Sequence, residues 1–511
     1  MLLRLNRKKD CAGARPVSIL IAIHSQLGGF ALETVDQRKE YGRFRPVFAI
    51  KSQLQKRTSA FRQGRRILLA AGLFFLVVDA SAEPSDGIPV PSIATSLPDN
   101  GDPTGVRKWL SERGITYGAV YTGEALGNVS GGIRQGGLYG GKLEMAVGAN
   151  LEKLIGWQGL SFFANAFQIH RSSGPRDQHF TSLVTISNIE AVSSNRLSEL
   201  WFEQKFFDDR FSIRFGQLTT DAEFFISDYS RMFISSDWPT IMGANIPSGG
   251  PAYPLATPGI RWKFDPNAHW SMLLGLYNGD PGDQAIVNRT GTNFRINDPP
   301  LLMGEVQYRY NQAKESHGLA GTVRLGGWHH FGRFNDLRFD SAGLSLADPL
   351  SSGIARQFRG TSGIYGIIDQ QLYRPEGGGP DSGISVFSRI SGTPSDRNLV
   401  DFFLDGGVVF AGMVPQRPDD RFGASFIYAR MSDRARALDR DLIAFSGVAQ
   451  PIRNYEMTIE LSYQAQIRPG WTMQPVLQYI IHPGGHVPDP ISPSAAIKSG
   501  ALLGVRSTVA F

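Results

Sequence analysis

The chain has very little cysteine and no apolar run long enough for a transmembrane helix. Cys11 is the single cysteine in 511 residues, and mean hydropathy is only −0.17. One thiol cannot form an internal disulfide. The apolar run Ile67–Val78 has twelve residues, whereas a helical span needs about 20. We therefore expect neither a disulfide scaffold nor a bundle of membrane helices.

Charge is scarce as well. Asp, Glu, Lys and Arg make up 19% of the chain, against about 25% in typical globular proteins. Glycine is abundant, with 58 residues, and aromatic residues reach 11%. After Gly114 no long apolar pattern with a helical period occurs. This composition favours β-structure with many turns.

The N-terminal region has the features of an export signal. Three arginines at 62–66 precede the apolar run 67–78, and Ala-Ser-Ala follows at 80–82. This order predicts a secretory signal peptide over 55–82, cleaved after Ala82; a buried helix or anchor is the alternative. Signals lie at a true N-terminus, so residues 1–54 are either an extended leader or the product of a misassigned start, and we favour the latter.

Removing the leader changes the net charge of the chain. Residues 1–82 hold 15 of the 52 Lys and Arg residues and 5 of the 46 Asp and Glu residues, so the remainder carries a net charge of −4. The pI near 9.3 thus reflects mainly the leader and is no evidence for nucleic-acid binding. Cys11 leaves with the leader, so thiolate metal sites and a cysteine nucleophile are also excluded from the exported chain.

The exported chain has two parts. Residues 83–105 are rich in Pro, Ser, Asp and Gly, which predicts a flexible N-terminal segment. Residues 106–113 can form two helical turns. From there to residue 511 the pattern predicts one β-domain, so we place the domain boundary at 106.

The clearest strand pair lies near the end of the chain. Apolar residues alternate with polar ones from Tyr455 to Ile467, Arg468–Gly470 makes a turn, and alternation resumes over 471–481. Successive strand side chains point to opposite faces, so each strand has one apolar and one polar face.

A second hairpin covers 197–218, and weaker alternation recurs along the chain. The other runs are 115–125, 138–149, 160–170, 259–264, 270–277, 303–310, 320–331, 362–373, 383–391, 401–411, 421–430 and 500–511. Long segments rich in Gly, Pro, Asp and Ser separate some of them, at 219–258, 278–299 and 333–358.

These strands favour a membrane-spanning barrel over a soluble sandwich. Strands of 9–11 residues with a continuous apolar face match a bilayer-spanning barrel, and the polar face then lines a wet interior. In lipid only helices and closed barrels satisfy every backbone group. At about 27 residues per strand and connection, the exported chain predicts a barrel of about 16 antiparallel strands. A barrel of that width encloses an aqueous channel.

The last strand is expected to close the barrel. Leu503, Val505 and Phe511 share one face of the stretch GALLGVRSTVAF, and Arg506 lies on the other. An unpaired strand of this kind is prone to aggregation. We expect it to pair with the first strand near 115–124 and to place Phe511 in an interfacial aromatic girdle.

Four blocks resemble a known family. They are GITYGAVYTGEALGN (114–128), RFSIRFGQLTTDAEF (210–224), YPLATPGIRWKFDPN (253–267) and WTMQPVLQYIIHPGG (471–485). These blocks are similar to those of the carbohydrate-selective porins, the OprB family, from about residue 107 to 511. The resemblance implies a 16-stranded barrel in the bacterial outer membrane with sugar-permeable pores, and a homotrimer as its assembly. It also implies that the strand ending in Phe511 is recognised by the barrel-insertion machinery.

The hypothesis for function is passive, carbohydrate-selective diffusion of small, glucose-like sugars into the periplasm. It requires no enzyme activity, no cofactor and no partner other than sugars, outer-membrane lipids and the assembly partners just named. The alternative is an outer-membrane barrel enzyme of lipase or esterase type, with a Ser–His pair on the lipid-facing wall. A soluble exported β-lectin is a third hypothesis.

The best candidate for a sugar-selective constriction is the segment 219–258. A sugar pore needs aromatic faces together with hydrogen-bond donors and acceptors. The predicted constriction residues are Glu223, Asp228, Arg231, Asp237 and Trp238. An external loop with solvated charges is the alternative for this segment.

Charged residues on the polar faces of strands are expected to line the channel. They are Glu199, Glu203, Lys205, Arg214, Glu456 and Glu460. No metal site is expected, because His329 and His330 face opposite sides of a strand and His482 and His486 flank a glycine turn.

Overall fold

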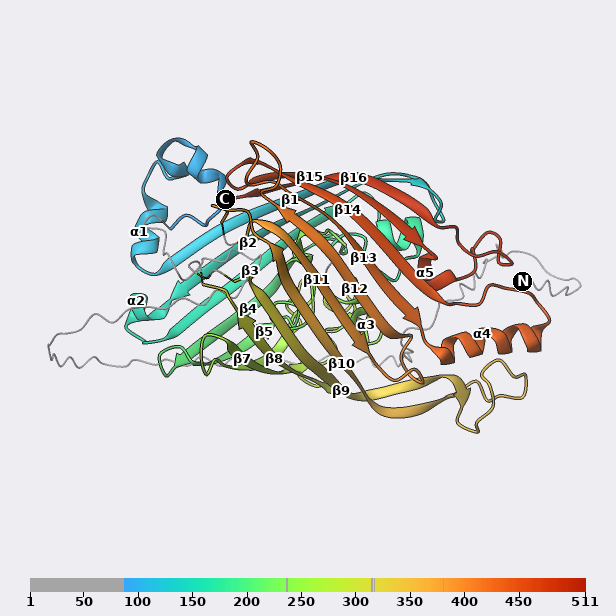
Figure 1. Cartoon of the computed structure of the whole chain (residues 1–511). Helices are drawn as coiled ribbons and strands as arrows, with labels where there is room; N and C mark the ends of the chain where they lie inside the picture. The colour runs from blue at the N-terminus through green and yellow to red at the C-terminus, as the bar shows by residue number, and fades with distance from the viewer. Residues whose placement is uncertain (1–86, 236–237, 314–315, 317, 380) are drawn as a thin grey trace, which may run out of the picture. The chain divides into compact units, whose positions relative to one another are not determined.

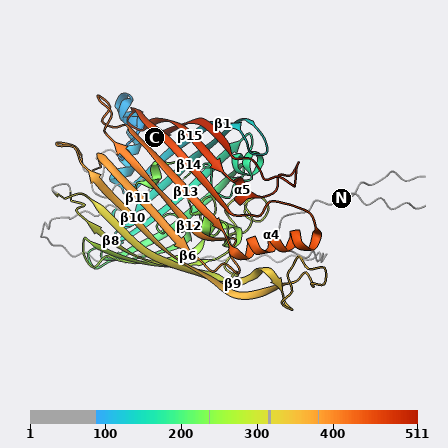
Figure 2. The same cartoon turned by 45° about the vertical axis from the view of Figure 1, so that its right-hand side comes forward.

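Sixteen antiparallel strands close into a barrel in the computed structural model, which describes residues 87–235, 238–313, 316, 318–379 and 381–511. The chain divides into two units, residues 1–66 and 67–511, and all the described residues belong to the second. The leader at 1–54, the signal peptide at 55–82 and Cys11 therefore lie outside the described residues. Figures 1 and 2 show the strands running obliquely around the wall.

Each strand corresponds to one of the expected alternating runs, so the prediction of a 16-stranded transmembrane barrel is confirmed. The strands are β1 (Ile115–Ser130), β2 (Gly136–Asn150), β3 (Leu160–Arg171), β4 (Ser194–Phe206), β5 (Phe211–Leu218), β6 (Thr257–Phe264), β7 (Trp270–Asn278), β8 (Pro300–Tyr310), β9 (Gly321–Asp340), β10 (Ala355–Tyr373), β11 (Gly383–Gly392), β12 (Val400–Ala411), β13 (Arg421–Met431), β14 (Tyr455–Arg468), β15 (Trp471–Ile481) and β16 (Gly500–Ala510).

The closing seam joins β16 to β1, as expected, but further along β1. Val120 lies opposite Ala510, and the pairing continues to Ser130 opposite Ala501. Phe511 exchanges two main-chain hydrogen bonds with Ala119, at 2.7 and 3.1 Å. The seam covers 119–130 rather than 115–124, because β1 is longer than its alternating pattern predicted. No open sheet edge remains at this seam.

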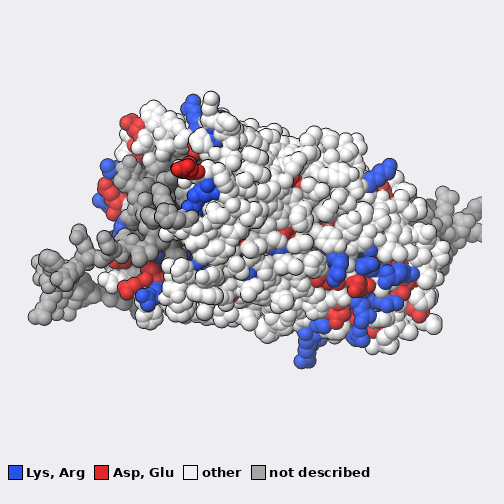
Figure 3. Space-filling model, viewed as in Figure 1, with Lys and Arg blue, Asp and Glu red and all other residues white. Residues whose placement is uncertain are grey.

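The two faces of the wall differ as the sequence predicted. On β14, Glu456 and Glu460 are fully buried, whereas Ile459 and Leu461 are 37% and 48% exposed. In Figure 3 the wall is nearly free of charged atoms between the two ends of the barrel. An uncharged outer surface of this kind suits the hydrocarbon region of a bilayer.

The barrel has a short-turn end and a long-loop end. Phe511 and α1 (Val106–Glu112) lie at the short-turn end, which confirms the short N-terminal helical segment. Before α1, residues 87–105 form two 3₁₀ turns, η1 (Ile93–Ser96) and η2 (Pro98–Gly101). The remaining short helices are α2 (Leu151–Ile155), η3 (Pro175–Phe180), η4 (Ser230–Met232), α3 (Thr240–Gly243), η5 (Pro247–Gly249) and α5 (Pro483–His486).

Two features of the long-loop end were not predicted. The segment 333–358 was expected to be irregular, but β9 continues to Asp340 and β10 begins at Ala355. The helix α4 (Asp433–Ser446) was also missed. Its buried side is made partly of Ala435 and Ala437, so no strong apolar period appears in the sequence. None of the helices in the described part of the chain is both long and apolar enough to cross a membrane.

Candidate functional site

Two long loops fold into the barrel and narrow its interior. We call residues 172–193, which follow β3, inner loop 1, and residues 219–256, which follow β5, inner loop 2. Both reach β14, which is far from β3 and β5 in the strand order. Leu183 of inner loop 1 and Ile234 of inner loop 2 each donate a backbone N–H to a β14 carboxylate, at 2.9 and 2.8 Å. The expected long segment at 219–258 is therefore an internal loop.

Carboxylates on the barrel wall hold both loops. We call this group the wall carboxylates: Glu124, Glu305, Asp369, Glu456 and Glu460, all buried. Each accepts at least one hydrogen bond from an inner loop. Buried backbone N–H groups must find acceptors, and an ionised carboxylate is an acceptor of up to four hydrogen bonds.

Glu456 is the anchor of inner loop 1. It accepts the backbone N–H groups of Leu183 and Val184, both at 2.9 Å, and the hydroxyl of Ser182. It also accepts the N–H of Gly484 in α5 at 2.6 Å. One wall side chain thus ties the inner loop to an outer loop.

Glu460 does the same for inner loop 2. It accepts the N–H groups of Ile234 at 2.8 Å and Ser235 at 2.9 Å. On β15, Gln474 and Gln478 donate to main-chain carbonyls of inner loops 2 and 1, each at 2.8 Å. The polar face of the β14–β15 hairpin is therefore largely covered by the loops.

Apolar contacts fix inner loop 2 further. Phe225 stacks on Tyr365 with ring centroids 4.0 Å apart, and Phe233 packs against Phe387. A Cβ atom on Gly423 of β13 would lie 2.9 Å from Phe233 and 2.4 Å from a carbonyl oxygen of β12. Only glycine leaves room for the loop here. Inner loop 2 is thus packed like a core segment rather than lying free in the lumen.

Inner loop 2 carries a charged group that faces the lumen. The Asp228 carboxylate lies 2.6 Å from the Arg324 guanidinium, which also binds Asp369 at 2.5 Å. The Asp228 side chain is 42% exposed. Burial inside the barrel opposes its ionisation, but the charges of Arg324 and Arg231 outweigh this effect and lower the pKa of Asp228.

A second ion cluster lies on β4–β6. Arg261 binds Glu203 at 2.7 Å and Glu223 at 2.8 Å, and Arg214 approaches the same two carboxylates at 3.0 and 3.5 Å. Arg214 also stacks on the ring of Trp201, 3.9 Å from its centroid. Glu223 thus ties the start of inner loop 2 to the wall.

The predicted constriction residues therefore separate into groups. Asp228 and Arg231 lie together, and Glu223 belongs to the second cluster. Trp238 is half-buried against the apolar core, and its indole N–H donates to the carbonyl of Gly249 at 3.0 Å. Asp237 lies outside the described residues.

The predicted wall residues also differ in their environments. Glu203 and Arg214 belong to the second cluster, and Glu456 and Glu460 lie beneath the inner loops. Glu199 is buried and accepts the N–H of Thr219 at 3.2 Å, and Lys205 pairs with Asp209 at 3.5 Å beside a short turn.

Several charged residues on the inner wall were not predicted from the sequence. They are Glu124, Arg261, Glu305, Arg309, Arg324, Asp369, Arg389 and Asp405. All lie within runs expected to be strands. They could have been found from the sequence, because a charged residue in a membrane-spanning strand must face the lumen.

The match to known families agrees with this architecture. Residues 134–511 match the family described as "Carbohydrate-selective porin, OprB family". The chain belongs to the OprB family of carbohydrate-selective porins. It is therefore a sugar porin of the bacterial outer membrane, and a channel rather than an enzyme.

Individual relatives support this assignment. Porin B of Pseudomonas aeruginosa is 25% identical over 411 residues, which cover 75% of this chain and 87% of that protein. A structure of Pseudomonas putida OprB at high pH has a TM-score of 0.70 and 21% identity, and covers 81% of this chain and 98% of that one. At that identity the second similarity shows the fold alone.

The lipase or esterase alternative finds no support in these comparisons. A Ser–His pair does exist on the outward wall, with Ser362 Oγ 2.6 Å from His329 Nδ1. Within the described residues, however, the other ring nitrogen meets no carboxylate or amide that would orient it, and Phe331 packs edge-on against the ring. The Ser362–His329 pair therefore lacks the third member of a catalytic triad.

Histidines of this porin do not form a metal centre in the described part of the chain, where no group of three or more candidate ligands occurs. His482 and His486 do lie close, with ring centroids 4.6 Å apart, but His482 Nδ1 bonds to Asn454 at 3.1 Å.

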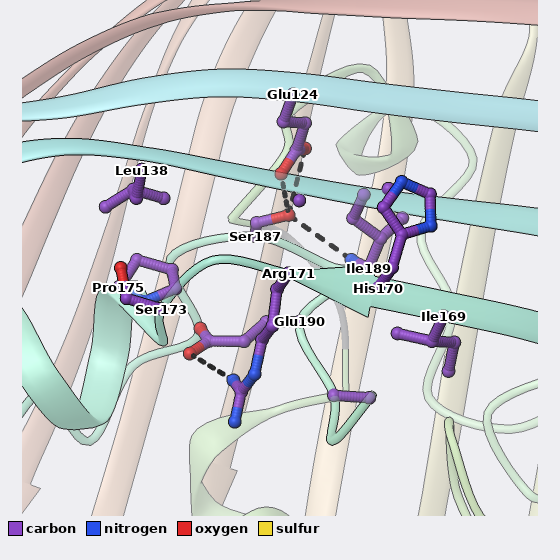
Figure 4. A pocket seen from close by; sticks show the side chains of 13 residues that line it. Glu124, Leu138, Ile169, His170, Arg171, Ser173, Pro175, Ser187, Ile189 and Glu190 are labelled. Carbon is purple, nitrogen blue, oxygen red and sulfur yellow. Dashed lines mark hydrogen bonds and ion pairs between the residues drawn. The ribbon is translucent and has the colours of Figure 1, made fainter. Parts of the chain in front are cut away.

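A small pocket lies between β1–β3 of this porin and inner loop 1 (Figure 4). Ser187 donates to Glu124 at one side of it, and Arg171 lies 3.6 Å from Glu190 at the other. Burial raises the pKa of Glu190 to about 7, because the neighbouring charges of Arg176 and Arg171 only partly offset the loss of solvent. Inner loop 1 therefore carries a carboxyl group that titrates near neutrality.

Proposed function

We propose that the selective part of this porin is the lumen-facing group of Asp228, Arg231 and Arg324, and that it passes glucose-like monosaccharides. The observation that carries the proposal is the exposed Asp228 carboxylate, which lies between arginines on a tightly packed loop. Acidic and basic groups alternate there, so sugar hydroxyls would find both acceptors and donors. Ions gain less, because each fixed charge already has a counter-charge beside it.

The other predicted residues take supporting roles in this proposal. Trp238 supplies an apolar ring face for the C–H side of a pyranose, and Asp237 remains a predicted constriction residue. Glu203, Arg214 and Glu223 position the start of inner loop 2, and Glu199, Glu456 and Glu460 hold loops against the wall. Lys205 lines the mouth at the short-turn end.

Assembly is part of the same proposal. Four small residues, Ala119, Gly123, Ala125 and Gly127, lie on the outward face of β1 together with Tyr121, whose ring lies over Gly123. We propose this face for packing in a homotrimer. The β16 strand with Phe511 is the segment we propose for recognition by the insertion machinery. The leader directs export, and outer-membrane lipids surround the apolar wall.

The test is sugar block of ion current through single channels. Arg231→Ala should weaken block by glucose about tenfold, since a hydrogen bond to a charged group contributes on the order of 1.5–3 kcal/mol. Trp238→Ala should weaken it about threefold to tenfold, because it removes the aromatic face against which the sugar ring packs. Arg468→Ala, at the exposed end of β14 beside a short turn, is the matched control and should behave like the wild type. Unchanged block in both test variants would remove inner loop 2 from the selectivity filter.

A further inference from the structure

Two arginines lie opposite each other on the outer wall without an acidic partner. Arg333 on β9 and Arg359 on β10 are paired in the ladder, and both are exposed. Arg333 lies two residues after the outward-facing Phe331 on β9, and Arg359 lies opposite Arg333 at the same level of the wall. Among the described residues, neither guanidinium has an ion-pair or hydrogen-bond partner.

This pairing is unfavourable without a ligand. Side chains directly opposite in an antiparallel ladder have Cβ atoms about 5 Å apart, and like charges at such positions repel. The nearby acids are already engaged. Asp336 projects to the other face of β9 and binds Arg356, and Asp396 binds Arg397. An anion from outside the described residues would remove this repulsion.

The height of the pair on the wall identifies its surroundings. At the short-turn end, Tyr308 and Tyr310 pack together on the outward face, and Tyr310 lies opposite Gly321. From Gly321 to Phe331 is ten residues along β9, about 34 Å of strand. With a tilt of 35–45° this is about 25 Å of height, the thickness of the apolar band of such barrels.

Between these levels the outward face is apolar. Leu325 and Ile364 are 65% and 74% exposed there. Beyond Phe331 the outward residues are Arg333 and Asn335, and opposite them are Arg359 and Gln357. Figure 3 shows charged atoms gathering over α4 and the adjoining ends of β9 and β10, next to the uncharged wall. The arginine pair therefore lies at the level of the lipid headgroups, at the long-loop end, which is the extracellular end in outer-membrane barrels.

We propose that Arg333 and Arg359 form a site for the phosphate of an outer-leaflet lipid headgroup. Guanidinium groups bind phosphate through two parallel N–H donors each, and a doubly charged phosphate matches two arginines. Asn335 and Gln357, also opposite each other and exposed, add amide donors on the side away from the acyl chains. Leu325, Ile364 and Phe331 lie beneath, where the acyl chains run, so the occupant is a lipid rather than a free phosphate ion.

The experiment is native mass spectrometry of the full chain in detergent, titrated with bisphosphorylated lipid A. The test variant is Arg333→Gln/Arg359→Gln. The matched control is Arg210→Gln/Arg468→Gln, two exposed arginines in or beside short turns at the other end of the barrel. The test variant should bind the lipid at least tenfold more weakly than the wild type, and the control within twofold. Dephosphorylated lipid should bind the wild type as weakly as the test variant binds lipid A.

Three results would overturn the site. They are unchanged lipid A binding by the test variant, equal binding of the dephosphorylated lipid by the wild type, and complete displacement of lipid A by millimolar inorganic phosphate. Sugar block should stay normal in the test variant, because both arginines face away from the lumen. If the double variant fails to fold, Arg333→Gln and Arg359→Gln alone should each bind lipid A at least threefold more weakly than the wild type. Binding as tight as that of the wild type in both single variants would refute the proposal.

Discussion

At the scale of single residues, the wall carboxylates decide the shape of the channel. Four of them, Glu305, Asp369, Glu456 and Glu460, accept N–H groups of loop backbone, which has no strand to pair with inside the lumen. A side-chain carboxylate replaces the missing strand partner. The alternating pattern correctly predicted that Glu456 and Glu460 face inward. It could not predict that loops 273 and 226 residues away in sequence would cover them.

The Glu460→Gln variant tests this role. The amide keeps one acceptor oxygen but turns an NH₂ group towards one of the two loop N–H donors. We expect a cost on the order of 1–3 kcal/mol in the attachment of inner loop 2, seen as noisier single-channel current and at least threefold weaker glucose block. Glu376→Gln, in an exposed turn, is the control. Identical current noise and block in both variants would show that Glu460 does not hold the loop.

The constriction residues could be predicted only in part from the sequence. Asp228 and Arg231 were selected because charges clustered in one long segment, and they do lie together. Arg324, the ion-pair partner of Asp228, lies 96 residues after it, within an ordinary alternating strand pattern. Such a contact depends on the barrel closing, so only the inward direction of Arg324 could be predicted, from the cost of a charge in lipid.

At the scale of elements, strands were predictable and loops were not. Period-2 alternation marked all sixteen strands, because each has one face in lipid and one in water. Beyond the membrane both faces of a strand meet water, so the extension of β9 to Asp340 has no alternation of apolar and polar residues that could have predicted it. The helix α4 depends instead on the Ser432 cap, whose hydroxyl accepts the N–H of Ala435, and on Gly447 beyond its end.

Inner loop 1 should respond to pH through Glu190. Its folded pKa of about 7 lies above the unfolded value of 4.5, so the packed loop holds an extra proton between these values. The loop's stability is therefore full below about pH 4.5 and falls as pH rises to about 7, by on the order of 3 kcal/mol. The charges that face this carboxyl are Arg171, Arg176 and Asp177.

Hydrogen exchange of the inner loop 1 amides at pH 5 and pH 8, corrected for intrinsic rates, measures this effect. The wild type should be less protected at pH 8, and Glu190→Gln should lose that dependence. Asp177→Asn, an exposed neighbour at 63%, should keep it. Equal pH dependence in the wild type and Glu190→Gln would refute the assignment.

At the scale of the whole molecule, closure of the barrel removes the last free edge. The seam pairs β16 with β1, and Phe511 adds two main-chain hydrogen bonds to Ala119. Because every backbone group in lipid needs a partner, a defect at this seam should affect insertion before it affects selectivity.

Deleting Phe511 should thus lower the yield of folded porin in outer membranes several-fold, while the channels that do assemble keep normal sugar block. Phe207→Ala removes an aromatic ring that is 76% exposed at the same end but away from the seam, and should leave the yield unchanged. Heat-modifiable mobility on gels measures the folded fraction. A normal folded yield after the deletion would contradict a role for Phe511 in assembly.

The central claim is that the barrel is a water-filled channel selective for sugars. Reconstitution of the exported chain in planar bilayers tests it most directly. We predict discrete conductance steps that glucose blocks in proportion to its occupancy, with far weaker block by triethylene glycol, an uncharged non-sugar molecule of similar size. Absence of conductance steps, or equal block by both solutes, would contradict the account.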